Sequence, residues 1–345
     1  MQLYEQYAVT TVFVCPLYLA TIILGSLGTG IVIHAYVTDK ATHKAFTFLL
    51  TNLAIADLIV CSLFTPLLFC YRVHETAGII GFTPLCELCL FLSMSSTSLI
   101  FLVFPLLAYC RKDAMLLPDH PRFSLERART VTRVFWVLSI LSGVMMVVMA
   151  WCDLANKDSV FPYLYRCLII NQSLDLHAQV FLGYSIPLFG LSITVTFIIY
   201  IQIYCSKSSP TVTLSFEEWQ TTKVCFCSAV IYVVCWTPFV LVQMSGVFGT
   251  YTELHFNLHG MSSAIGVLGS ALSSWLYIMG IPYYKAEMKR FHRLDKNSID
   301  ISGKGSALAG FYVCFFLHVF TLWNYGNFVD SLSQMFRRLN SPVSN

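Results

Sequence analysis

The chain has 345 residues, of which 57% are hydrophobic and only 11% are charged, and its formal net charge is +3. Soluble domains carry about 25% charged residues, so this composition, with a mean hydropathy of +0.69, excludes a soluble globular protein. The apolar segments are long and continuous, which also excludes a β-barrel built from alternating strands of ~10 residues. The sequence therefore predicts an all-α membrane protein that crosses the bilayer several times.

Seven apolar segments are long enough to cross a bilayer, whose hydrocarbon core needs about 20 helical residues. The predicted spans are residues 10–37, 47–71, 83–110, 131–151, 177–203, 221–246 and 260–282. Residues 1–9 lack the basic region of a cleavable signal peptide. We therefore interpret the first segment as a transmembrane helix that follows a short extracellular N-terminus.

The positive charges predict how the spans are oriented. Lysine and arginine gather in the loops after the first, third and fifth spans and after the seventh span, whereas the other loops hold only Arg72, Lys157 and Arg166. Cytosolic loops carry the excess of positive charge, so the N-terminus is predicted to lie outside. The sequon at Asn171 then falls in an outer loop and is a candidate glycosylation site. An unused sequon is an alternative of equal weight.

The tail, residues 295–345, is predicted to be cytosolic and contains an unexplained apolar run at 307–323. Three interpretations stay open: an eighth span, a segment on the membrane surface, or a stretch outside the functional coding sequence. Apolar residues between 328 and 339 recur on one helical face beside two arginines, which suits a helix lying in the membrane interface.

Several motifs stand in a fixed order along the spans. They are the LAIAD segment from Leu53 to Asp57, the uncharged helix from Cys86 to Arg111, Trp136 in the fourth span, Pro187 in the fifth, and Cys235-Trp236-Thr237-Pro238 in the sixth. Together, residues 10–294 resemble the rhodopsin-like G-protein-coupled receptors. The resemblance implies a seven-helix bundle with an extracellular N-terminus and a short cytosolic helix after the seventh span. It also implies heterotrimeric G proteins and arrestin as partners.

Cys86 and Cys167 are predicted to form a disulfide. Both fall on the outer side of the membrane in the predicted topology, and that compartment is oxidising. Cys152 is a competing partner.

Asp57 is the only carboxylate well inside a predicted span, and an intramembrane acid is a functional residue by default. In the family this acid holds a sodium ion together with polar groups of helices three and seven. Here Ile100 stands at the helix-three serine position, and the helix-seven asparagines are missing. A hydrogen-bonded structural aspartate is the alternative to a sodium site, and no other cofactor is expected.

The switch residues implied by the resemblance are Arg111, Glu218, Trp236, Pro238, Tyr284 and the buried Asp57. Cys110 stands where the family has an acid before the arginine, so Glu218 is the predicted ionic partner of Arg111 across the inner mouth. A solvated arginine is the alternative. Pro238 bends the sixth helix beside Trp236, which can couple ligand contact to bending. Tyr284 is taken as the seventh-helix tyrosine of the family's Asn-Pro-x-x-Tyr motif.

The ligand pocket is expected in the outer half of the bundle. By position, its lining comprises Ser93, Met94, Thr97, Gln179, Gly183, Phe239, Val240, Gln243, Ala271 and Ser274. Ser93 replaces the aspartate of amine receptors, and Ser274 with Trp275 excludes a retinal-bearing lysine. A pocket this apolar favours a small lipid-like or amphipathic ligand. Arg166 is placed to meet an acid group, with an ordinary loop arginine as the alternative.

The function expected is that of a plasma-membrane receptor that couples such a ligand to heterotrimeric G proteins. Several polar residues of the family's motifs are replaced in this chain. This leaves open the alternative of a receptor-fold decoy or partner subunit with weak G-protein coupling. A transporter is less favoured because no internal repeat and only one buried charge are visible. An enzyme is rejected because no HExxH, histidine cluster or paired carboxylates occur inside a span. Membrane lipids, and no nucleic acid, are the other expected partners.

Overall fold

The computed structural model describes residues 12–38, 44–76, 83–116, 123–155, 179–207, 216–248 and 253–298. Over these ranges all regular structure is helical, and seven helices are long and apolar enough to cross a membrane. They are Val12–Thr38, Ala45–Val73, Glu87–Leu116, Leu125–Cys152, Phe181–Ser206, Phe216–Gly246 and Asn257–Gly280. The predicted seven-helix bundle is therefore confirmed. The apolar run at 307–323 lies outside the described residues.

The first span begins as helix at residues 12–20 and continues into the labelled elements. In chain order these are η1 (Thr21–Gly25), α2 (Ser26–Thr38), α3 (Ala45–Ile59), η3 (Val60–Phe64), α4 (Thr65–Thr76), α5 (Thr83–Leu116), α6 (Leu125–Ala155), η4 (Phe181–Ser185), α9 (Ile186–Lys207), α10 (Phe216–Phe248), α11 (Glu253–Gly280) and α12 (Pro282–Ser298). The fourth and sixth helices begin several residues before their predicted starts, because charged residues outside the apolar run still continue the helix.

Two of the spans contain a wide π-helical turn directly before a proline. Pro66 follows η3 after one residue, and Pro187 follows η4 after one residue. Proline lacks the backbone N–H and its ring clashes with the carbonyl four residues earlier, so the preceding turn widens. The Thr65 hydroxyl donates to the carbonyl oxygen of Val60 at 2.7 Å, which satisfies one backbone acceptor in the widened turn.

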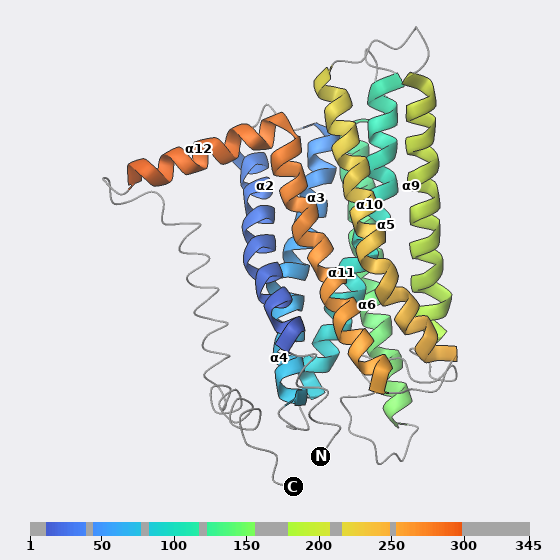
Figure 1. The fold of residues 1–345 in the computed structure, drawn as a ribbon. Coiled ribbons are helices and arrows are strands. Elements are labelled where there is room, and N and C mark those ends of the chain that lie inside the picture. The colour runs from blue at the N-terminus through green and yellow to red at the C-terminus, as the bar shows by residue number, and fades with distance from the viewer. Residues whose placement is uncertain are drawn as a thin grey trace.

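The third helix, α5, lies at the centre of the bundle. It packs against α3, α6 and α9 and also contacts α10 (Figure 1). In its most apolar stretch 56% of the third span is buried, against 22% of the fourth and 28% of the fifth. The fourth and fifth spans therefore present most of their surface to the lipid. The second, third and seventh spans, which are 61%, 56% and 61% buried in their most apolar stretches, form most of the core.

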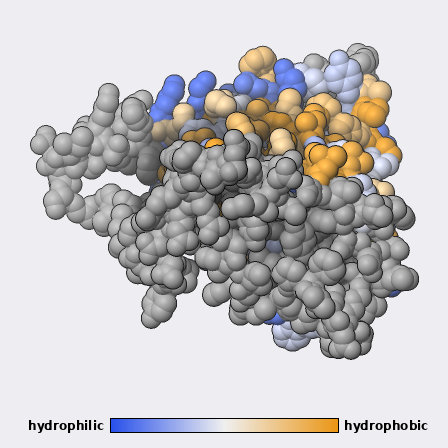
Figure 2. Space-filling model, turned by 60° about the horizontal axis from the view of Figure 1, so that its bottom comes forward, coloured by the Kyte–Doolittle hydropathy of each residue, from blue (hydrophilic) through white to orange (hydrophobic). Residues whose placement is uncertain are grey.

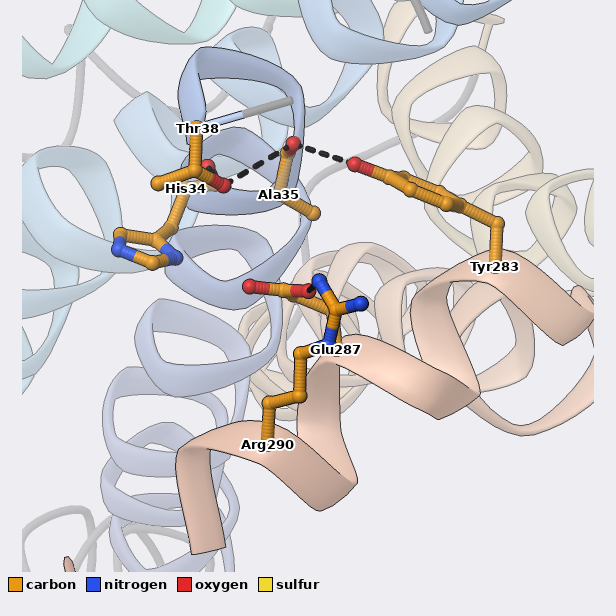
Figure 3. A network of polar contacts seen from close by, with 6 residues as sticks. All are labelled: His34, Ala35, Thr38, Tyr283, Glu287 and Arg290. Atoms are coloured by element: carbon orange, nitrogen blue, oxygen red, sulfur yellow. Dashed lines mark hydrogen bonds and ion pairs between the residues drawn. The ribbon is translucent and has the colours of Figure 1, made fainter. Parts of the chain in front are cut away.

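Helix α12 turns away from the bundle after Ile281 and crosses its end (Figure 1). The Tyr283 hydroxyl donates to the carbonyl oxygen of Ala35 in α2 at 2.5 Å, and Glu287 pairs with Arg290 at 3.2 Å (Figure 3). This is the short helix expected after the seventh span. It begins at Pro282, the residue at which the seventh span was predicted to end, and α11 ends two residues earlier, at Gly280. The difference arises because the apolar run continues across the bend.

The described side chains on one face of the molecule are largely hydrophobic, with hydrophilic residues gathered toward one margin (Figure 2). Leucine, isoleucine and valine residues on α6 and α9 are also exposed, which suits contact with lipid tails.

Candidate functional site

The bundle has two ends, which hold different polar groups. We call them the Arg72 end, where α4 ends and α11 begins, and the Arg111 end, where α9 ends and α12 begins. Asp57 lies between the two ends, in α3.

The Asp57 carboxylate is fully buried and is held by hydroxyl groups of two other helices. The Tyr232 hydroxyl of α10 donates to Oδ1, and the Ser273 hydroxyl of α11 donates to Oδ2 at 3.3 Å. The Tyr232 oxygen also lies 2.9 Å from Oγ of Ser270. One buried acid therefore links helices two, six and seven. Ile100 of α5 contributes only packing, as expected from its apolar side chain.

Sodium at Asp57 stays a prediction. Both carboxylate oxygens accept a hydrogen bond from a hydroxyl group, and each oxygen keeps a further lone pair that a cation could use. Among the described residues, no group of three or more histidine, cysteine or acidic side chains is placed to hold a metal.

The seventh helix carries a second buried link. Tyr277 is fully buried, and its hydroxyl lies 2.5 Å from Oγ of Ser228 in α10. Ser273 precedes Tyr277 by four residues, the spacing between the asparagine and the tyrosine in the family motif. Tyr284, which was expected to be that tyrosine, lies in α12 instead, because α11 ends at Gly280.

Tyr284 packs against its neighbour Tyr283, with ring centroids 5.1 Å apart. Burial raises the pKa of the Tyr284 hydroxyl, which has no hydrogen-bond partner in the described part of the chain. This tyrosine therefore stays neutral at physiological pH.

Arg111 is buried at its end of the bundle, with its guanidinium carbon 3.7 Å from the centroid of the Phe46 ring. This geometry is a cation–π contact. Glu218 is exposed, and the structure shows no ion pair between it and Arg111. The contact between α5 and α10 at this level is instead made by Thr222, whose hydroxyl lies 3.4 Å from the Met115 sulfur.

A cavity opens near the Arg72 end between the second, third, fifth, sixth and seventh helices. Six residues of the predicted pocket line it: Ser93, Met94, Thr97, Phe239, Val240 and Gln243. Gln179 and Gly183 are exposed on the outside of the bundle, and nothing lies within 4 Å of a Cβ added at Gly183.

Ala271 and Ser274 are buried but face the first span, because a Cβ built at Gly25 or Gly28 would approach them at 3.2 and 3.1 Å. The pocket prediction is wrong for these two residues and for Gln179 and Gly183. The rotation of each helix about its own axis cannot be derived from composition, and it directs these four positions away from the cavity.

Trp236 lies at the wall of this cavity and is buried. Its ring packs edge-on against Phe101 and Phe239, with centroids 6.5 and 5.6 Å away. The indole nitrogen has no hydrogen-bond partner among the described residues. Pro238 interrupts α10 two residues further on, so the ring that contacts the cavity stands beside the weakest point of that helix.

Sequence reasoning missed a polar cluster at the Arg72 end. The Arg72 Nη2 atom lies 3.3 Å from Nδ1 of His259, and the His259 Nε2 atom lies 3.4 Å from the Gln243 amide nitrogen. Tyr18 and Ser263 add a hydroxyl pair at 2.8 Å. Arg72 had been counted only as a loop charge. Arg72 comes directly after the predicted second span, six residues after Pro66, and this position was the available signal that it continues the helix.

Four predicted features lie outside the described residues. These are Cys167, Arg166, Asn171 and the side chain of Cys86. The disulfide and the glycosylation therefore stay predictions. Cys152 is exposed near the end of α6.

The fold and these contacts define an integral membrane protein of seven helices with a buried acid and a cavity between the helices. The family model described as 7 transmembrane receptor (rhodopsin family) matches residues 28–277. The chain therefore belongs to the rhodopsin family of seven-transmembrane receptors, as its motifs had indicated. It is a multi-pass protein of the plasma membrane, and its family is one of receptors rather than enzymes.

Relatives with assigned names share low identity with the chain. Cysteinyl leukotriene receptor 1 of Cavia porcellus is 27% identical over 189 residues, 53% of this chain and 55% of that receptor. Hydroxycarboxylic acid receptor 1 of Mus musculus is 25% identical over 77% of both chains. Opsin-3 of Manduca sexta is 21% identical over 79% of this chain and 75% of the opsin. The chain thus spans about half the length of the first of these relatives.

Proposed function

We propose that this protein transduces the binding of an extracellular, small, lipid-like or amphipathic ligand to heterotrimeric G proteins, with arrestin as a further partner. The observation that carries the proposal is the cavity whose wall includes Trp236 beside Pro238. A ligand in this cavity touches the ring, and the ring is part of the helix that has to bend.

The chemistry of the cavity wall supports the ligand class. Most of the lining is hydrophobic, including Phe64, Leu68, Leu90, Met146 and Val267. Apolar walls with a few polar groups favour a ligand that is mainly hydrocarbon. The relatives do not narrow the ligand class further, since the three described above are a cysteinyl leukotriene receptor, a hydroxycarboxylic acid receptor and an opsin.

The test places a tryptophan at a position that lines the cavity and compares this variant with one that has a tryptophan at the next residue, outside the cavity. Val240 lines the cavity, whereas Leu241 is 59% exposed on the lipid face of the same helix. Cells that express the wild type, Val240→Trp or Leu241→Trp at equal surface levels are exposed to lipid fractions, and energy transfer from receptor to G protein is recorded.

We expect a lipid fraction to recruit G protein to the wild type and to Leu241→Trp but not to Val240→Trp. The same response from all three chains contradicts a ligand site in this cavity. A wild type that binds lipid without recruiting G protein favours the alternative function of a receptor-fold decoy or partner subunit.

A further inference from the structure

We propose that the cavity opens sideways into the bilayer between α6 and the first turns of the fifth span, and that the hydrocarbon chain of a membrane lipid enters it there. The inference rests on the proposed function for the existence of a ligand, and adds the side from which that ligand arrives. Its basis is a cavity wall that reaches the seam between two loosely packed helices.

The cavity reaches this seam from inside the bundle. Met146 of α6 lines it on one side, and Ser185 of η4 and Leu188 of α9 line it on the other. Both helices pack closely against α5, but over the described residues no close packing joins them to each other. Ser185 and Leu188 are partly exposed, and Pro187 between them is exposed. The wall of the cavity therefore continues into the lipid-facing surface of the fifth span.

The first turn of the fifth span, η4, is loosely attached to the bundle. Its close packing among the described residues is with α9, which continues it. Tyr184 still touches the main core, whereas Phe181, Leu182 and Ile186 form a separate apolar cluster. The widened turn before Pro187 explains this divergence, because proline breaks the regular hydrogen bonding that would keep the helix straight.

Firm contact between the fifth span and α5 begins further along the helix. The Phe189 ring packs edge-on against Phe101 with centroids 5.0 Å apart, and the Ser192 hydroxyl donates to the Phe101 carbonyl oxygen at 2.5 Å. Nearer the Arg72 end, the Ser185 hydroxyl makes a long contact of 3.4 Å with the Met94 sulfur, and a thioether is a weak acceptor. The fifth span is therefore fixed to α5 beyond the seam and weakly held beside it.

The seam lies at the depth of the hydrocarbon core. The fourth span ends at Cys152, six residues after Met146, and the fifth begins at Phe181, seven residues before Leu188. At 1.5 Å per helical residue, both side chains lie about 10 Å inside the ends of their spans. An opening at this depth meets acyl chains rather than water. The largely apolar lining offers such a chain surroundings like those of the bilayer.

The test needs no known ligand and no G protein. The purified full-length chain is placed in nanodiscs of phosphatidylcholine that include the same lipid with a diazirine on one acyl chain. After irradiation, labelled residues are identified by mass spectrometry. Thr97 of α5 and Phe239 of α10 line the cavity and report on its interior, whereas Ile198, 48% exposed on α9, reports on the lipid-facing surface. We expect label on all three, because a lipid that stays in the bilayer reaches the interior only through the wall of the bundle.

A variant that narrows the seam tests the route. Ser185→Trp should lose the label on Thr97 and Phe239 and keep it on Ile198. Leu191→Trp is the matched control, because Leu191 is 65% exposed on the same helix, and it should be labelled like the wild type.

A wild type labelled at Ile198 and at neither inner residue overturns the sideways opening, whatever the variants do. Equal inner labelling of the wild type and Ser185→Trp overturns the seam between α6 and the fifth span as the route. A protein that admits the lipid probe but never recruits G protein contradicts the proposed function alone. A protein that responds to a ligand applied from water, with its inner residues unlabelled, contradicts the sideways opening alone.

Discussion

At the scale of single residues, the contact between Tyr232 and Asp57 distinguishes this chain from its family pattern. A hydroxyl of the sixth helix joins Ser273 of the seventh helix beside the acid, where polar groups of helices three and seven were expected. Since a buried carboxylate is costly without donors, this hydroxyl ties α10 to α3 in the closed bundle.

We therefore predict that Tyr232→Phe melts at a lower temperature than the wild type in detergent. Removing the hydroxyl leaves a buried acceptor with one hydrogen bond fewer, which costs about 1–3 kcal/mol, and the ring itself is retained. Tyr204→Phe is the matched control, because Tyr204 is 68% exposed. Equal melting temperatures for wild type and Tyr232→Phe, measured by thiol- or dye-based unfolding, would show that the contact carries no stability.

Residue identity alone predicted some parts of the site and not others. Asp57 stands out because acids are rare inside apolar spans. Tyr232, Ser273 and Tyr277 do not, since tyrosine and serine are ordinary in such helices and their partners depend on how each helix is rotated. The rotation of each helix also separates Gln243, which lines the cavity, from Ser274, which faces the first span.

At the scale of helices, the close packing of α5 against α6 depends on Gly143. A Cβ at this position would meet the backbone oxygen of Phe91 at 2.8 Å and also collide with the Ser95 side chain. Overpacking of this kind costs about 1–3 kcal/mol, so Gly143→Ala should lower the melting temperature.

Gly190→Ala in α9 is the matched control, because nothing lies within 4 Å of the added carbon. Alanine is favoured over glycine by about 1 kcal/mol in a helix, so this variant should melt at or above the wild-type temperature. If the two alanine variants melt alike, the packing between α5 and α6 is looser than the structure indicates.

The number of helices was predictable because each apolar run must match the thickness of the bilayer. The bend at Ile281 was not, because apolar residues continue through it. The first residues of α6 and α10 were predicted too late in the chain, because each helix already includes charged residues before its apolar run begins.

At the scale of the whole molecule, the basic residues gather at the Arg111 end, including Lys44, Lys112, Lys207 and Lys285. Cytosolic surfaces carry this excess, so the Arg72 end and its cavity should face outward. An epitope at residue 1 should then bind antibody on intact cells, whereas one inserted in 208–215 should bind only after permeabilisation. The reverse pattern would put the cavity on the cytosolic side and exclude an extracellular ligand.

The most direct test of a receptor switched through α10 is ligand-independent second-messenger output at equal surface expression. The wild type should exceed mock-transfected cells, because no acid precedes Arg111 and no Arg111–Glu218 pair holds the mouth closed. Tyr232→Phe should exceed the wild type, since loss of one buried hydrogen bond between α10 and α3 shifts a two-state equilibrium about tenfold. Arg111→Ala should fall to the mock level. If all three chains give the mock level, the protein does not couple by this route, and the decoy interpretation replaces the receptor.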